Sequence, residues 1–291
     1  MWTYKIFIMK NFFPFSLVLL LIPFFSFTQL QTPDASPRAK VFQKVGLVEI
    51  ILDYSRPSKK GREIYGGLVP FNKIWRTGAN SPTTISFSDD IKINNELISK
   101  GEYHLYSVPS QSSFDLVIYE KTNAWGSLSE FDESLIKARL TSELNDLPFS
   151  VETFTISIAN ITNNGSSLNI IWDNKIAVFT IDVLTKNKMI QNINTVLSEN
   201  PTENDYRKAA VYYYEENIDM KMAVKWIDKA YKDSDDLKYW QLRYKALIYE
   251  KAGKIKKARE YAKLGYNKAM TNNIPDGINS LEIIVARLSK N

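Results

Sequence analysis

The chain has 291 residues and a formal net charge of +5, with 37 Lys and Arg against 32 Asp and Glu. This length suits two domains of ordinary size, and so small an excess of positive charge does not argue for nucleic-acid binding. The sequence contains no cysteine, which excludes disulfides, thiolate catalysis and Cys-ligated zinc.

Residues 1–28 are typical of a secretory signal peptide. Two lysines and no acid accompany an apolar run at residues 12–27, and small residues precede Gln29. A membrane anchor is the alternative, but a membrane-spanning helix needs about 20 apolar residues. We therefore expect cleavage near Gln29, export to the periplasm or the extracellular space, and no membrane span in the mature chain.

Residues 34–183 are expected to form a β-sandwich. Within GLVEIILDY, alternate residues from Val48 to Tyr54 fall on one face of a strand. Further alternating segments follow, separated by Gly, Pro, Asn or Asp: TTISF, YHLYSV, FDLVIY, VETFTISI, SLNIIW and IAVFTIDV. Eight or nine short strands without helices between them predict an antiparallel sandwich or jelly roll.

Residues 185–291 change to the 3.6-residue period of a helix. After a connecting helix in NKMIQNINTVLSENP, two stretches align at a spacing of 35: Val211, Tyr214, Ala223, Trp226 and Ala230 against Ala246, Tyr249, Ala258, Tyr261 and Gly265. Small residues at helix crossings with an aromatic between them are typical of stacked helical hairpins. This half resembles tetratricopeptide repeats, which implies a surface for a protein partner, and GINSLEIIVARL would form a final helix. The whole chain is thus predicted to be a multidomain α+β protein.

The β half resembles the domain of unknown function family 2911 over about residues 34–183. The resemblance lies in SPRAKV, DYSRPSKKGREIYGGLVPFNKIWRTGAN, GEYHLYSVPS, NAWGS and LPFSVETFTISI. It implies an exported protein of Bacteroidetes-type bacteria. It implies no particular activity or cofactor, so hypotheses about function rest on the residues themselves.

A cluster of arginine and aromatic residues is the main candidate binding site. The candidate residues are Tyr54, Arg56, Arg62, Trp75, Arg76, Thr77, Asn80 and His104. A guanidinium binds carboxylate or phosphate through two parallel hydrogen bonds and stacks on aromatic rings, so one hypothesis is a pocket for an anion or a sugar acid. The other is a packed corner, in which the arginines satisfy loop carbonyls and Trp75 closes the end of the sandwich.

His104 is the only histidine, which excludes a histidine-rich metal site. We interpret it as structural or merely exposed, on the same strand face as Tyr106. The pair Asp89 and Asp90, and DSDD at 233–236, are expected in turns or helix caps. No residue is assigned a catalytic role, and no metal or other cofactor is expected.

Two functional hypotheses follow. The first is an exported, non-enzymatic protein that binds a ligand through the sandwich and another protein through the helical repeats. The alternative is a cell-envelope enzyme that acts on a glycan or an anionic small substrate through the arginine and aromatic cluster. A pocket that joins Arg56 and Arg76 to an acid with a strongly perturbed pKa would favour the enzyme, whereas a filled sandwich end would favour the scaffold.

Overall fold

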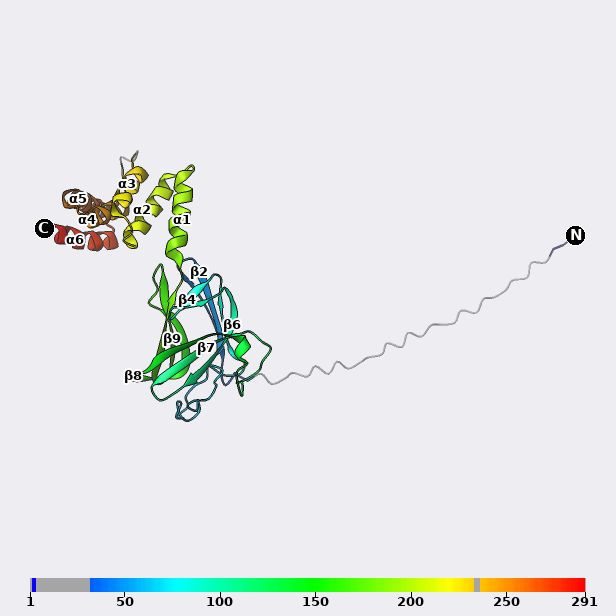
Figure 1. Cartoon of the computed structure of the whole chain (residues 1–291). Coiled ribbons are helices and arrows are strands. Elements are labelled where there is room, and N and C mark those ends of the chain that lie inside the picture. Colours follow the sequence, from blue (N-terminus) through cyan, green and yellow to red (C-terminus); the bar gives the residue numbers. More distant parts are fainter. Residues whose placement is uncertain (1, 4–31, 233–235, 291) are drawn as a thin grey trace.

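The computed structural model describes residues 2–3, 32–232 and 236–290 of the chain, and nine strands are followed by six α-helices (Figure 1). The expected signal peptide lies almost wholly outside the described residues, as do three of the four residues of DSDD. Within the described parts, no helix combines the length and the hydropathy that crossing a membrane requires.

The β half is antiparallel throughout, which confirms the predicted class. Its strands follow one another across the sheet in the order β1-β2-β3-β6-β7-β8-β9-β4-β5. They are β1 (Arg38–Val45), β2 (Val48–Ser55), β3 (Thr83–Phe87), β4 (Ile91–Ile93), β5 (Glu96–Ile98), β6 (Gly101–Pro109), β7 (Ser113–Glu120), β8 (Ile136–Ala159) and β9 (Gly165–Asp182). A short 3-10 helix, η1 (Glu133–Leu135), precedes β8.

The strand β8 connects two layers because its partners change along its length. Residues 136–143 pair with β7, whereas residues from 144 onward pair with β9. Side chains from β2, β3, β6 and β7 then meet side chains from β4, β8 and β9 in one hydrophobic core. Trp172 and Phe154 are among the largest side chains that are fully buried in it. The result is a sandwich-like fold.

The alternation in the sequence predicts the faces of the strands correctly but not all of their lengths. Val48 and Leu52 are at most 1% exposed, as the pattern requires. The segments SLNIIW and IAVFTIDV, predicted as two short strands, form the single 18-residue strand β9. Asp173 has a φ of 54°, so the polar residues between the two segments bend the strand locally without ending it.

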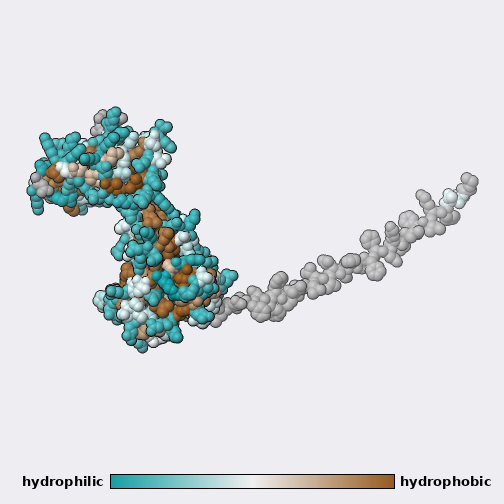
Figure 2. All heavy atoms as spheres, viewed as in Figure 1, coloured by the Kyte–Doolittle hydropathy of each residue, from teal (hydrophilic) through white to brown (hydrophobic). Residues whose placement is uncertain are grey.

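The helical half contains a connecting helix, two helical hairpins and a final helix. The helices are α1 (Thr185–Ser198), α2 (Glu203–Glu215), α3 (Met220–Ala230), α4 (Tyr239–Lys251), α5 (Ile255–Thr271) and α6 (Pro275–Ser289). The helix α2 packs on α3, and α4 packs on α5. At a crossing, a Cβ on Gly265 would lie 3.1 Å from Leu242 Cβ, which explains the small residue there. Figure 2 shows hydrophilic residues over much of the visible face of both halves.

An aromatic pair fills each hairpin. Tyr249 lies edge-on to Tyr261 with ring centroids 5.2 Å apart. In the first hairpin Trp226 lies edge-on to Tyr213 at 4.6 Å. The 35-residue alignment had placed Tyr214 in that role, so the observed partner is one residue earlier in α2.

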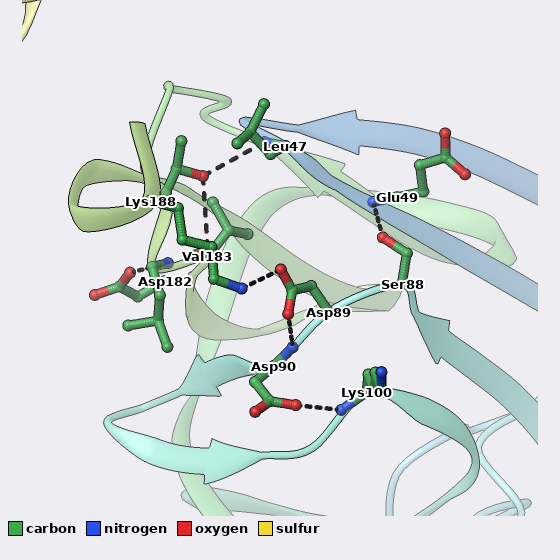
Figure 3. Close-up of polar contacts among 11 residues, drawn as sticks. Leu47, Glu49, Ser88, Asp89, Asp90, Lys100, Asp182, Val183 and Lys188 are labelled. Atoms are coloured by element: carbon green, nitrogen blue, oxygen red, sulfur yellow. Dashed lines mark hydrogen bonds and ion pairs between the residues drawn. The ribbon is translucent and has the colours of Figure 1, made fainter. Parts of the chain in front are cut away.

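Polar contacts join the two halves where β9 leads into α1. Lys188 forms an ion pair with Asp89, and the backbone nitrogen of Leu47 donates to Thr185 Oγ1 at 3.4 Å (Figure 3). The ammonium group of Lys188 donates a hydrogen bond to the Asp89 carboxylate and thereby lowers the pKa of Asp89. Gly46 has a φ of 54°, and a Cβ there would lie 2.3 Å from Thr185 Oγ1. This junction therefore requires glycine both for its backbone conformation and for its close approach.

Candidate functional site

The long loop between β2 and β3 carries most of the predicted site residues, and Trp75 anchors it to the sandwich. The Trp75 side chain is 8% exposed. Its indole nitrogen donates to the Gly78 carbonyl at 2.9 Å, and its ring lies nearly parallel to Trp172 at 5.9 Å. Its backbone pairs with Ser107 through two hydrogen bonds of 2.8 Å. The loop is thereby joined to β6 by an antiparallel bridge.

Three further candidates form hydrogen bonds within the sandwich or the loop. The Tyr54 hydroxyl donates to the Ile156 carbonyl at 3.1 Å and accepts from the Ile156 nitrogen at 3.0 Å. Thr77 is fully buried with a φ of 52°, and its hydroxyl lies 2.9 Å from that of Ser107. Asn80, also at positive φ, is exposed and donates to a serine hydroxyl in β2. Thr77 and Asn80 therefore tie the loop to its neighbours, whereas Tyr54 joins β2 to β8.

Two of the three arginines also use their donors within the protein. Arg56 Nε donates to the Phe154 carbonyl at 3.0 Å, and its Nη2 donates to Thr155 Oγ1 at 2.8 Å. Arg62 donates to the carbonyls of Lys59 and Ser58 at 2.9 and 2.5 Å. Both guanidinium groups therefore satisfy polar groups of their surroundings.

Arg76 differs from the other two arginines. Its Nη1 lies 3.5 Å from Ser127 Oγ, at the limit of a hydrogen bond, and its buried Nε has no partner among the described residues. A buried donor without a partner is unusual in a native structure. Arg76 thus retains unused hydrogen-bonding capacity.

An ion pair fastens the other side of the loop. Lys59 Nζ lies 2.6 Å from Asp173 Oδ1, and Ser150 donates to the same oxygen at 2.7 Å. Burial alone would raise the pKa of Asp173, but the hydrogen bonds from Lys59 and Ser150 lower it. The neighbouring Tyr65 hydroxyl is buried and has no hydrogen-bond partner within the described parts of the chain. Burial, together with the charge of Asp173, raises the pKa of Tyr65.

A cavity of about 360 Å³ opens beside Trp75 and Arg76; we call it the Trp75 cavity. Its described lining contains no Asp or Glu, and its four cationic residues are Lys60, Arg62, Lys73 and Arg76. Apolar side chains, including Leu68 and Ile74, form another part of the wall. Residues 29–184 contain 15 Lys and Arg against 18 Asp and Glu, so this concentration of positive charge is local and does not follow from composition.

The structure separates the predicted residues into distinct environments. Arg62, Trp75 and Arg76 line the Trp75 cavity, whereas Arg56 does not. His104 lies on the outer face of the sheet, where its ring lies edge-on to Tyr106 at 6.2 Å, and it lines a different cavity. Within the part of the chain that the structure describes, no group of three His, Asp or Glu side chains is placed to hold a metal ion.

Sequence reasoning missed most of the cavity lining, including the polar residues Lys60, Lys73 and Ser127. Lys60 and Lys73 belong to the same loop as the arginines, and their positive charge could have indicated that they belong to the same site. Ser127 lies 51 residues after Arg76, in the segment that connects β7 to β8, and the fold brings the two residues together. Its segment, NAWGS, resembles the family 2911 sequence pattern, but its residue types do not by themselves indicate a binding role.

Comparison with known proteins gives one match. The sequence profile of a family described as "Protein of unknown function (DUF2911)" matches residues 36–181. The match begins just before β1 and ends within β9, so it covers the β half and nearly all residues that line the two cavities. No curated protein and no solved structure matches the chain.

Proposed function

The chain belongs to the DUF2911 family, and we propose that it is an exported binding protein that takes a small organic anion in the Trp75 cavity. The helical half would contact a partner protein. The observation that carries the proposal is the set of four cationic side chains, with no carboxylate in the described lining, beside an apolar wall.

The lining favours a ligand with two chemically different parts. Lys60, Lys73 and Arg76 form no ion pair among the described residues, so a carboxylate or phosphate would supply a charged partner for them. Leu68, Ile74 and the edge of Trp75 would contact an apolar or ring-shaped body. The volume of about 360 Å³ suits a small molecule. Sugar acids and aromatic carboxylates both fit this description.

Binding accounts for this lining better than the enzymatic alternative does. Hydrolysis of a glycosidic bond ordinarily uses two carboxyl groups placed on either side of that bond. The described lining of the Trp75 cavity supplies cations and hydroxyl groups instead. An anion held there would be positioned and desolvated, but the lining offers no carboxyl group to exchange a proton with it.

Export and the protein partner rest on other parts of the chain. The signal-like composition of residues 1–28 supports export. Leu264 and Met270 of α5 and Ile283 of α6 are each more than half exposed, which supports a contact surface on the last two helices. The resemblance to tetratricopeptide repeats supports the same conclusion.

Isothermal titration of the purified protein with 2-naphthoate and, separately, with glucuronate tests the proposed ligand class. At least one anion should bind, and its affinity should fall as the ionic strength rises, because the cations are accessible to salt. The proposal fails if neither anion binds, or if the affinity is independent of salt.

A further inference from the structure

A second cavity lies on the outer face of the sheet and differs from the Trp75 cavity in its chemistry; we call it the Trp125 cavity. Its volume is also about 360 Å³. Asp53, Thr84 and His104 line it, and the strand register places these three residues opposite one another on β2, β3 and β6. They form a continuous row of polar side chains across three adjacent strands.

His104 has a ring nitrogen directed to no partner. The side chain is 4% exposed, and its Nε2 lies 2.9 Å from the Thr122 carbonyl. A carbonyl oxygen only accepts, so Nε2 carries the hydrogen and Nδ1 of the neutral ring is an acceptor. Nδ1 is buried and has no partner among the described residues. His104 thus contributes to the wall of the cavity, while Nδ1 itself has almost no accessible surface.

The charges around this cavity are balanced. Arg38 Nε lies 2.5 Å from Asp53 Oδ1, and Lys121 Nζ lies 2.7 Å from Glu102 Oε1. All four residues belong to the lining, so two acids face two bases. Such a lining presents both donors and acceptors without a net charge. It suits an uncharged ligand that carries many hydroxyl groups better than it suits an anion.

Trp125 provides an apolar platform at the same cavity. It is 75% exposed, and it lies in the segment that follows β7, next to Gly126 at a φ of 79°. Trp125 belongs to the lining of the polar cavity, so its exposed indole is available to a ligand bound there. A pyranose ring has one face of C–H groups that packs on an indole and a rim of hydroxyl groups that reach the polar lining.

We propose that the Trp125 cavity binds a neutral saccharide. One sugar ring packs on Trp125, while hydroxyl groups donate to Asp53 and accept from Arg38, whose side chains are both accessible. This site is independent of the Trp75 cavity, because different side chains line it and because it requires no charge on the ligand.

The test is a titration of the full protein with four neutral oligosaccharides of different linkage: cellotetraose, laminaritetraose, maltotetraose and N-acetylchitotetraose. At least one should bind. Trp125→Ala should weaken that binding about tenfold or more, since the aromatic contact is lost. Its melting temperature should stay at the wild-type value because the side chain is exposed. Phe149→Ala, which removes another aromatic that is 61% exposed, is the matched control and should bind as the wild type does.

A second variant distinguishes hydrogen bonding from stacking alone. Asp53→Asn keeps the shape of the side chain but removes its charge and one acceptor, so it should also lower the affinity for the bound sugar. Arg76→Lys should leave that affinity unchanged. The proposal is overturned if none of the four sugars binds, or if the Trp125→Ala and Asp53→Asn proteins both retain the wild-type affinity.

Discussion

The Trp75 cavity and the Trp125 cavity have equal volumes, but the lining of the first is positively charged and that of the second is balanced. The segment 123–127 lines both, with Ser127 in the first and Trp125 in the second. The first gathers four cations without a carboxylate, whereas the second pairs each cation with an acid. Both are built in a half of the chain that is slightly acidic overall. The comparison shows that the charge of a cavity depends on which side chains a loop brings together and not on the net charge of the domain.

The two tryptophans give the sharpest contrast between the cavities. Trp75 is packed against Phe154 at 5.0 Å and against Trp172, so Trp75→Ala should lower the free energy of unfolding by about 3–5 kcal/mol. Trp125→Ala removes an exposed ring and should change it by less than about 0.5 kcal/mol. Urea denaturation followed by circular dichroism measures both. Equal losses in the two variants would contradict the assignment of Trp75 as the anchor of the loop.

Arg76→Lys should affect the Trp75 cavity alone. The change keeps one positive charge but loses the planar fork, and a hydrogen bond to a charged group contributes about 1.5–3 kcal/mol. We therefore expect the affinity for a bound carboxylate to fall at least tenfold. Unfolding free energy should fall by under about 1 kcal/mol.

The control for this variant is Arg139→Lys, at a residue paired with Glu133 away from the cavity, which should bind the anion as the wild type does. If Arg76→Lys instead costs several kcal/mol of stability and leaves the anion affinity intact, then Arg76 is part of a packed corner and not of a binding site.

A smaller effect should appear in the pH dependence of stability. The pKa of Asp173 is lowered in the folded protein, so its ion pair with Lys59 stabilises the loop above the unfolded pKa of about 3.9. This contribution is lost as the pH falls through the folded pKa. Asp173→Asn should cost about 1 kcal/mol at pH 7, and the difference from the wild type should shrink below about pH 4. A difference that stays constant from pH 7 to pH 3 would contradict this linkage.

Periodicity was sufficient to predict the antiparallel strands and the helical hairpins, because the side-chain repeat of a strand or helix is a local property. It placed Val48 and Leu52 in the core and located the change from strands to helices near Thr185. It failed at Asp173, where a polar residue at positive φ continues a strand. Local sequence carries no information on whether such a residue ends a strand or bends it.

The candidate site was predicted only in part, because a cavity depends on contacts between distant segments. Trp75 and Arg76 were recognised from their unusual setting in WRTGAN. The same reasoning grouped Arg56 and His104 with them, although these two lie elsewhere. Neither sequence proximity nor residue type reveals which groups these side chains contact. Arg56 donates to the Phe154 carbonyl in β8, and His104 is hydrogen-bonded to the Thr122 carbonyl.

The central claim is that the Trp75 cavity selects for negative charge, and the most direct test compares an anion with its neutral isostere. Isothermal titration with 2-naphthoate and 2-naphthamide gives an affinity ratio for the wild type and for a Lys60→Gln, Lys73→Gln double variant. The ratio should exceed about ten in the wild type, a difference of about 1.4 kcal/mol, and should fall in the variant. Equal affinities for the acid and the amide in the wild type would contradict the account.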